Sequence, residues 1–302
     1  MKTKVMKFGG SSVSNAVNIS KVIAIVSRSL NKDTGVVVVV SAFGGVTDEL
    51  IELAKLASQK DFRYKALLQK IYKRHDQAIK ELIKPKFRQK MLIGAKGRYD
   101  DLEKIIKKIF VYPQLSKASL DAVMSFGEQL SAYIINEAMR DTGLSSKFVD
   151  TRDLIKTDDN FGNANVDIET SYKSIRNHLQ NRGESRYSLA VTGGFIGSTK
   201  DSVTTTLGRG GSDYSAALMG AALDAIVIEI WTDVDGLMTA DPRVVKSAKT
   251  IPEISYAKAE AMALAGAKVI HPKTIEPARL KNIPIYVKNT FNKDNPGTLI
   301  KN

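Results

Sequence analysis

The sequence predicts an α/β fold built on a mostly parallel sheet, and three kinds of observation lead to that prediction. Short apolar runs typical of strands alternate along the chain with longer segments of helical periodicity. The run GVVVVVSA at residues 35–42 is continuously apolar and mostly β-branched, as in a strand buried on both faces of a parallel sheet. Several apolar runs end in paired glycines, which permit tight turns at the edge of such a sheet.

The individual elements follow from these patterns in order. Before residue 195 we expect strands at 5–8, 35–42, 146–150 and 188–194. Between them we expect a helix from about residue 19 and a helix after FGGVTDEL that Thr47 or Asp48 can cap. Amphipathic helices within 62–110 that break at Pro85, and a helix at 119–139, should follow. After it we expect a small-residue helix at 212–223, a strand within 225–236 that leads into an acidic turn, helices at 255–268 and 272–282, and a strand at 283–290. The alternation is compatible with two lobes that meet near Gly193–Gly197.

Composition excludes several classes of protein. The 302 residues suffice for a substantial core, and 43% of them are hydrophobic. Cysteine is absent, which excludes disulfide frameworks and thiolate chemistry. The N-terminus lacks the apolar stretch of a signal peptide, and the longest plain apolar run, Val36 to Val40, is too short to span a membrane. We therefore expect a cytoplasmic protein without a membrane partner. The histidines at 75, 178 and 271 lack metal-ligand spacing, so no metal held by side chains is expected.

The net charge of +13 is high, and much of it lies in one segment. Residues 60–108 carry 16 lysines and arginines against 6 acidic residues. Such a segment either binds nucleic acid or an acidic surface, or forms solvated helical faces. Because few aromatic residues are interleaved with the cations, solvated faces are the favoured interpretation, and no specific nucleic-acid partner is expected.

Candidate chemistry collects at glycine-rich turns. Three predicted strands end at Gly9–Gly10, Gly44–Gly45 and Gly193–Gly194, and a fourth cluster lies in TTTLGRGGSD at 204–213, a composition not typical of a core helix or strand. Ligands of open α/β sheets bind beyond the carboxyl ends of the strands, so these turns predict one anion-binding crevice. The site is not a P-loop, since the dipeptide Gly-Lys never occurs, and Asp213 breaks a G-x-G-x-x-G pattern.

Charged residues accompany these turns. Lys7 lies inside the apolar strand VMKF, where it needs an anion: either a phosphate or the carboxylate of a structural salt bridge. Arg209 presents a planar fork suited to a carboxylate. Glu128 lies on an otherwise apolar helix and either faces solvent or, with Arg209, clamps the ammonium and carboxylate of a zwitterion. Thr232 and Asp233 follow a strand and either cap a turn or contact a nucleotide.

Together these motifs resemble one family, the aspartate kinases of the amino-acid kinase superfamily. The matching stretches occur in the family's order and cover nearly the whole chain: MKFGGSSV (6–13), VVSAFGGVTDEL (39–50), SFGEQLSA (125–132), GGFIGSTKDSVTTTLGRGGSDYSAAL (193–218), IWTDVDGLMTADPRVV (230–245), AGAKVIHPKTIEPA (265–278) and IPIYVKNT (283–290).

The resemblance implies an αβα sandwich, with a substrate lobe at about 1–195 and a nucleotide lobe at about 196–302. It implies catalytic roles for Lys7 and Asp213. The implied substrate-binding residues are Ser41, Thr47, Glu128, Phe195, Arg209 and Ser212. The implied nucleotide-binding residues are Lys7, Gly9, Gly10, Ser11, Thr232, Asp233, Met238, Arg243 and Lys268. Two departures stand out: Met238 replaces a usual tyrosine, and the ACT regulatory domains common in the family do not occur within these residues.

The implied reaction converts ATP and L-aspartate to ADP and 4-phospho-L-aspartate, the first step toward lysine, threonine and methionine. The β-carboxylate nucleophile is already ionised at neutral pH, so no general base is needed and catalysis consists of positioning and charge neutralisation. We expect Mg²⁺ to arrive on the ATP phosphates, and a homo-oligomer is compatible with the sequence. The alternatives are a related kinase acting on glutamate, acetylglutamate or UMP, a ligand sensor without turnover, and a nucleic-acid binder that uses segment 60–108.

Overall fold

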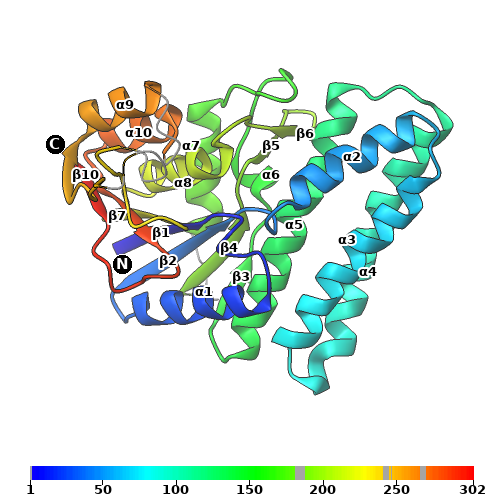
Figure 1. Ribbon diagram of the computed structural model, residues 1–302, viewed down its shortest axis with the longest axis horizontal. Coiled ribbons are helices and arrows are strands. Elements are labelled where there is room, and N and C mark those ends of the chain that lie inside the picture. The colour runs from blue at the N-terminus through cyan, green and yellow to red at the C-terminus, as the bar shows by residue number, and fades with distance from the viewer. Residues whose placement is uncertain (1, 181–187, 241–244, 246, 266–269) are drawn as a thin grey trace.

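The computed structural model describes residues 2–180, 188–240, 245, 247–265 and 270–302. Within these residues an eight-stranded sheet runs through the centre of the molecule (Figure 1). Across the sheet the strands are, in order, β3 (Ser146–Phe148), β4 (Leu189–Gly193), β2 (Thr34–Val40), β1 (Lys2–Phe8), β7 (Val227–Thr232), β9 (Ile285–Asn289), β10 (Thr298–Lys301) and β8 (Glu253–Ser255).

Most of this sheet is parallel. The strands from β3 to β9 pair in parallel, whereas β10 runs antiparallel to β9, and β8 then pairs in parallel with β10. The carboxyl ends of β4, β2, β1, β7 and β9 therefore meet at one edge, where a ligand site is expected. The two predicted lobes share this sheet, because β1 pairs with both β2 and β7.

Helices cover both faces of the sheet, which confirms the predicted αβα sandwich. The alternating side chains of β2 make the two faces visible: Val36, Val38 and Val40 pack into one core, and Val37 and Val39 into the other. The first core also contains residues of α1 (Ala16–Ser29), α2 (Val46–Ser58), α3 (Arg63–Leu82), α4 (Pro85–Val111) and α5 (Lys117–Asp141). The second contains residues of α6 (Thr151–Leu154), α7 (Ile168–Leu179), α8 (Gly211–Ala222), α9 (Tyr256–Leu264) and α10 (Pro272–Leu280).

The basic segment 60–108 forms the helices α3 and α4, which lie at the side of the molecule away from the sheet (Figure 1). Pro85 begins α4, where its missing N–H is not needed. The two helices pack through apolar side chains, and the Tyr72 ring stacks on Tyr99 with 4.2 Å between ring centroids. From α3, Arg74 donates hydrogen bonds to the carbonyl oxygens of Gly44 (2.7 Å) and Ser14 (3.1 Å), so this segment also supports two turns at the carboxyl edge of the sheet.

Two expectations from the sequence need correction. Thr204–Thr206 is a strand, β6, which pairs antiparallel with β5 (Ile196–Ser198) in a small second sheet, although its composition was not typical of a core strand. The pattern fails here because hydrogen bonds, not apolar side chains, hold β6 in place: Thr205 and Thr206 are fully buried with bonded hydroxyls. The sequence patterns also did not reveal the helices α6 and α7 or the short strands β5, β8 and β10. None of the described helices is long and apolar enough to cross a membrane.

Candidate active site

A cavity of about 550 Å³ lies at the carboxyl edge of the sheet. The turns that follow β1, β2 and β4 border it, together with α5 and the loop from β6 to α8. Its lining contains both residues predicted to be catalytic and every residue predicted to bind substrate: Lys7, Asp213, Ser41, Thr47, Glu128, Phe195, Arg209 and Ser212. Gly10 lines it as well. The predicted crevice is therefore present, and segments from both halves of the chain build it.

The glycines at this edge let backbone segments approach closely. A Cβ on Gly194 would lie 2.6 Å from the Cα of Ser212, which no side chain tolerates without a backbone shift. A Cβ on Gly193 would lie 2.9 Å from the Cβ of Glu128, so the end of β4 packs directly on α5. The Gly44 N–H donates to the Gly10 carbonyl oxygen at 3.1 Å and joins the turns after β1 and β2. The glycines, which have no side chain, thus let the segments that line the cavity pack closely against one another.

Lys7 and Asp213, which both line the cavity, form an ion pair with each other. Lys7 comes from β1, Asp213 from the first turn of α8, and the Lys7 Nζ lies 2.5 Å from the Asp213 Oδ1. The side chains are only 10% and 14% exposed, so the pair is largely removed from water. The carboxylate compensates the buried ammonium and also fixes its direction. Lys7 therefore has a protein partner and still lines the cavity.

Glu128 is buried rather than solvated. Its residue is 3% exposed, its Oε1 accepts a hydrogen bond from the Ala42 N–H at 3.2 Å, and its Oε2 has no hydrogen-bond partner among the described residues. Burial raises the pKa of Glu128 to about 8, and the Ala42 hydrogen bond only partly opposes this shift. An unpartnered buried carboxyl oxygen beside a cavity is a site that a cationic group would fill.

Arg209 differs from Glu128 in both charge and exposure. It is exposed, and its guanidinium makes no ion pair with any residue in the described part of the chain. It lies between Gly208 and Gly210, whose φ angles of 75° and 73° belong to the left-handed region that glycine adopts readily. The loop therefore presents at the cavity a planar cation that no described residue neutralises.

Phe195, which lines the same cavity, has a strained backbone conformation. Its φ of 67° is unusual for a residue with a bulky side chain. Two hydrogen bonds hold it: its N–H donates to the Ser215 hydroxyl at 3.0 Å, and its carbonyl oxygen accepts from the Leu207 N–H at 2.8 Å. Strain maintained in this way is common at functional sites.

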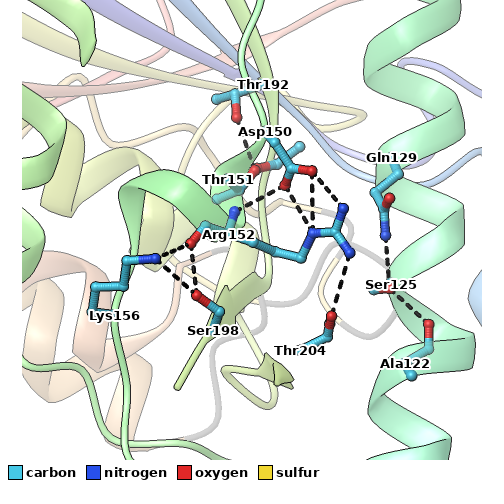
Figure 2. Close-up of polar contacts among 11 residues, drawn as sticks. Ala122, Ser125, Gln129, Asp150, Thr151, Arg152, Lys156, Thr192, Ser198 and Thr204 are labelled. Carbon is cyan, nitrogen blue, oxygen red and sulfur yellow. Dashed lines mark hydrogen bonds and ion pairs between the residues drawn. The ribbon is translucent and has the colours of Figure 1, made fainter. Parts of the chain in front are cut away.

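A polar network connects the start of α6 with the ends of β4 and β6 (Figure 2). The Thr151 hydroxyl contacts the Thr192 hydroxyl at 2.8 Å and donates to the Gly193 carbonyl oxygen, which anchors the end of β4 to the start of α6. Arg152 pairs with Asp150 at 2.6 Å and donates to the Thr204 hydroxyl at 3.4 Å. These contacts tie β4 and β6 to one short helix.

Of the residues predicted to bind nucleotide, Lys7 and Gly10 line the cavity. The Gly9 N–H donates to the Trp231 carbonyl oxygen at 3.0 Å, and the Ser11 hydroxyl donates to the Asp233 Oδ2 at 3.0 Å, so the ends of the adjacent strands β1 and β7 meet. Thr232 donates to the Asp233 Oδ1 at 3.2 Å. Met238 is half-buried and forms a β-bridge with Thr250. Arg243 and Lys268 lie outside the described residues.

Sequence reasoning missed several residues at the site. Asp48 and Gly162 line the cavity, and the buried carboxylate of Asp121 accepts hydrogen bonds from the N–H groups of Gly162 and Thr206. A signal for Asp121 was available, because it precedes Glu128 by two helical turns on the same apolar helix. In the described part of the chain, no group of three or more His, Asp or Glu side chains is arranged to hold a metal ion.

Comparison with known proteins extends the picture. The model of a family described as the amino acid kinase family matches residues 2–289. Lysine-sensitive aspartokinase 3 of Escherichia coli is 35% identical over 99% of this chain, which covers 64% of that protein. A bifunctional aspartokinase/homoserine dehydrogenase 2 of Arabidopsis thaliana is 35% identical over 98% of the chain, but the match covers only 32% of that protein.

Solved structures agree. A crystal structure of E. coli aspartokinase III in complex with aspartate and ADP superimposes with a TM-score of 0.90 and 34% identity. The match covers all of this chain and 65% of that one. The chain thus spans less than two thirds of the length of these relatives.

Proposed function

The chain belongs to the amino acid kinase family, and from this premise we propose that it transfers the γ-phosphoryl group of ATP to the β-carboxylate of L-aspartate. The products are ADP and 4-phospho-L-aspartate, which commits aspartate to the synthesis of lysine, threonine and methionine. One observation carries the proposal: Glu128 and Arg209 line the same cavity as the Lys7–Asp213 pair, and among the described residues neither the Glu128 Oε2 nor the Arg209 guanidinium has a charged or hydrogen-bonding partner.

We assign the amino-acid end of the substrate to two residues. Arg209 binds the α-carboxylate through its planar fork, and Glu128 accepts hydrogen bonds from the α-ammonium. Ser41, Thr47, Phe195 and Ser212 form the remaining walls of this pocket. Opposite charges held at two places favour a zwitterion whose side-chain carboxylate then points toward Lys7.

We assign the reacting end to Lys7. A β-carboxylate oxygen forms a bond to the γ-phosphorus as the bond from that phosphorus to the β,γ-bridging oxygen breaks, and ADP leaves with the electron pair. No proton moves, because the nucleophile is already ionised. The barrier is repulsion between two anions, which the Lys7 ammonium and the backbone N–H of Gly10 offset. The Gly9 N–H is not available for this role, because it donates to the Trp231 carbonyl oxygen. Asp213 acts by orienting Lys7 at 2.5 Å rather than as a base.

We place the nucleotide along the ends of β1 and β7. Gly9, Gly10 and Ser11 approach the phosphates, and Thr232, Asp233 and Met238 approach the nucleoside. The family resemblance adds Arg243 and Lys268 to this group. In this division the part up to about residue 195 supplies most aspartate contacts, and the part from about residue 196 supplies most nucleotide contacts. Arg209 and Ser212 belong to the second part but contact aspartate.

We propose that Mg²⁺ reaches the site on the ATP phosphates. No described cluster of three acidic or histidine side chains could enclose a cation, and Asp213 already pairs with Lys7. These residues fit a Mg²⁺ ion that keeps phosphate and water ligands, as magnesium usually does in phosphoryl transfer. Such an ion supplies charge neutralisation on the phosphates.

A substrate panel tests the proposal. ADP release is measured with ATP and Mg²⁺ in the presence of L-aspartate, D-aspartate, L-glutamate, N-acetyl-L-glutamate or UMP. We expect turnover with L-aspartate and little with N-acetyl-L-glutamate, which lacks the ammonium that Glu128 binds. Preference for UMP or an acetylated amino acid would contradict the proposal and favour a related kinase. No turnover with any acceptor, combined with binding of L-aspartate, would favour a ligand sensor.

A further inference from the structure

The helix that carries Glu128 holds a second buried carboxylate with no place in the proposed chemistry. Asp121 is 1% exposed and lies two helical turns before Glu128 on α5. Its Oδ2 accepts hydrogen bonds from the N–H groups of Thr206 (2.8 Å) and Gly162 (2.9 Å), and its Oδ1 accepts from the Thr206 hydroxyl at 2.9 Å. Three donors from two other segments therefore converge on one side chain.

These two segments are walls of the cavity. Gly162 and Thr206 both line it, and Thr206 is the last residue of β6, three positions before Arg209. The direction of the chain as it leaves β6 determines where the Arg209 loop begins. Asp121 therefore connects the helix of Glu128 to the loop of Arg209, across 85 residues of sequence.

The other threonines of β6 have different partners. The Thr205 hydroxyl contacts the Thr157 hydroxyl at 2.8 Å, and the Thr204 hydroxyl accepts from Arg152 at 3.4 Å, as Figure 2 shows. Neither partner belongs to α5. Asp121 is thus the described side chain that bonds β6 directly to the helix carrying Glu128.

We propose that Asp121 is a positioning residue that sets the distance between Glu128 and Arg209, and through it the enzyme's affinity for an α-amino acid. The inference rests on the proposed function, since it assigns the ammonium to Glu128 and the α-carboxylate to Arg209. An ammonium and a carboxylate on one carbon have a fixed separation, so a loop that shifts by even 1 Å weakens one of the two contacts.

The charge of Asp121 is not what this role requires. Burial raises the pKa of Asp121, while its three hydrogen bonds oppose that shift. An asparagine has nearly the same shape. Its amide oxygen can accept both N–H groups that now reach Oδ2, and its NH₂ can donate to the Thr206 hydroxyl, which is able to act as an acceptor. Alanine removes all three bonds and leaves the buried Thr206 N–H unpaired.

The test compares Asp121→Asn, Asp121→Ala and the control Thr205→Val, which removes a buried β6 hydroxyl bond that does not reach α5. Steady-state kinetics give the KM for aspartate, the KM for ATP and kcat for each. We expect Asp121→Ala to raise the KM for aspartate about tenfold or more, and the KM for ATP less than threefold. Asp121→Asn and Thr205→Val should keep the KM for aspartate within about threefold of the original chain. Equal changes in both KM values, or an unchanged KM for aspartate in Asp121→Ala, would overturn the inference.

Hydrogen exchange supplies a readout independent of turnover. Asp121→Ala should speed amide exchange in a peptide covering 204–213, whereas Thr205→Val and Asp121→Asn should not. Unchanged exchange in folded Asp121→Ala would overturn the positioning role even in a chain that turns over aspartate. Faster exchange in a protein that rejects aspartate would retain the positioning role and refute the proposed function alone.

Discussion

The affinity for aspartate should depend steeply on pH, because Glu128 must be ionised to bind an ammonium. Burial raises the pKa of Glu128 from 4.5 to about 8 when the site is empty. At pH 7 the free protein then holds Glu128 mostly as the neutral acid, with roughly one molecule in ten ionised. Binding of the ammonium selects the ionised form, so the substrate must supply the free energy of ionisation.

That free energy sets the size of the effect. Each pH unit below the pKa costs about 1.4 kcal/mol, which equals about tenfold in affinity. The sign is that of a carboxyl group with a raised pKa: the apparent KM for aspartate falls as pH rises toward 8 and then levels off. From pH 6 to pH 7 the KM should fall about tenfold, and from pH 7 to pH 8 about fivefold.

The assay measures initial rates of ADP release against aspartate concentration at several pH values between about 6 and 8, at saturating ATP. The matched control is Glu128→Gln, which keeps the shape but cannot ionise. It should have a high KM that does not vary with pH. His271 lies near Arg209 and Asp213, and burial and Lys273 lower its pKa from its ordinary value. The Glu128→Gln variant keeps His271 and therefore separates its titration from that of Glu128.

Two results would refute this reasoning. One is a KM for aspartate in the original chain that stays constant between about pH 6 and 8. The other is a Glu128→Gln variant with the same pH slope as the original chain, which would assign the titration to another group. If the KM for ATP varied with pH and the KM for aspartate did not, the titrating group would lie at the nucleotide instead.

Other expectations concern the remaining residues of the site. Lys7→Met should lower kcat by about 100-fold or more with a smaller change in the KM for aspartate, and near-normal kcat would contradict the role of Lys7. Arg209→Ala should raise the KM for aspartate about 10- to 100-fold at similar kcat, as steady-state kinetics would show. Gly194→Ala should lower the free energy of unfolding by about 1–3 kcal/mol and reduce activity, since its Cβ would lie 2.6 Å from the Cα of Ser212; urea denaturation checks this. Because Trp231 is the single tryptophan and its carbonyl oxygen accepts from the Gly9 N–H, ATP binding should change intrinsic fluorescence, and aspartate alone should change it less.

The sequence predicted the fold best where a residue's local pattern and its position in the folded protein have the same physical cause. The β-branched run at 35–42 predicted β2, all seven residues of which are buried. Pro85 marked the start of α4, because proline fits the first turn of a helix and not its interior. The paired glycines marked the turns at the carboxyl edge, where backbone must approach backbone.

Prediction from local pattern failed where distant segments decide the environment. Whether Glu128 faces solvent or core was open, because its burial depends on the end of β4, where Gly193 contacts it. The composition of Thr204–Thr206 was not typical of a core strand, because the side-chain partners that satisfy the hydroxyls of Thr205 and Thr206 lie 48 and 85 residues away. Local pattern left the anion beside Lys7 open between a phosphate and a carboxylate, and the fold places Asp213 at 2.5 Å from the Lys7 Nζ. Hydrophobic periodicity contains no information on such pairings.

The most direct test of the account is detection of the acyl phosphate itself. The chain is incubated with ATP, Mg²⁺, L-aspartate and hydroxylamine, which converts 4-phospho-L-aspartate to the β-hydroxamate of aspartate. The account predicts β-hydroxamate formed in step with ADP, and its loss in Lys7→Met. ADP release without hydroxamate, or hydroxamate formation that Lys7→Met leaves unchanged, would contradict the claim that this cavity phosphorylates the β-carboxylate of aspartate.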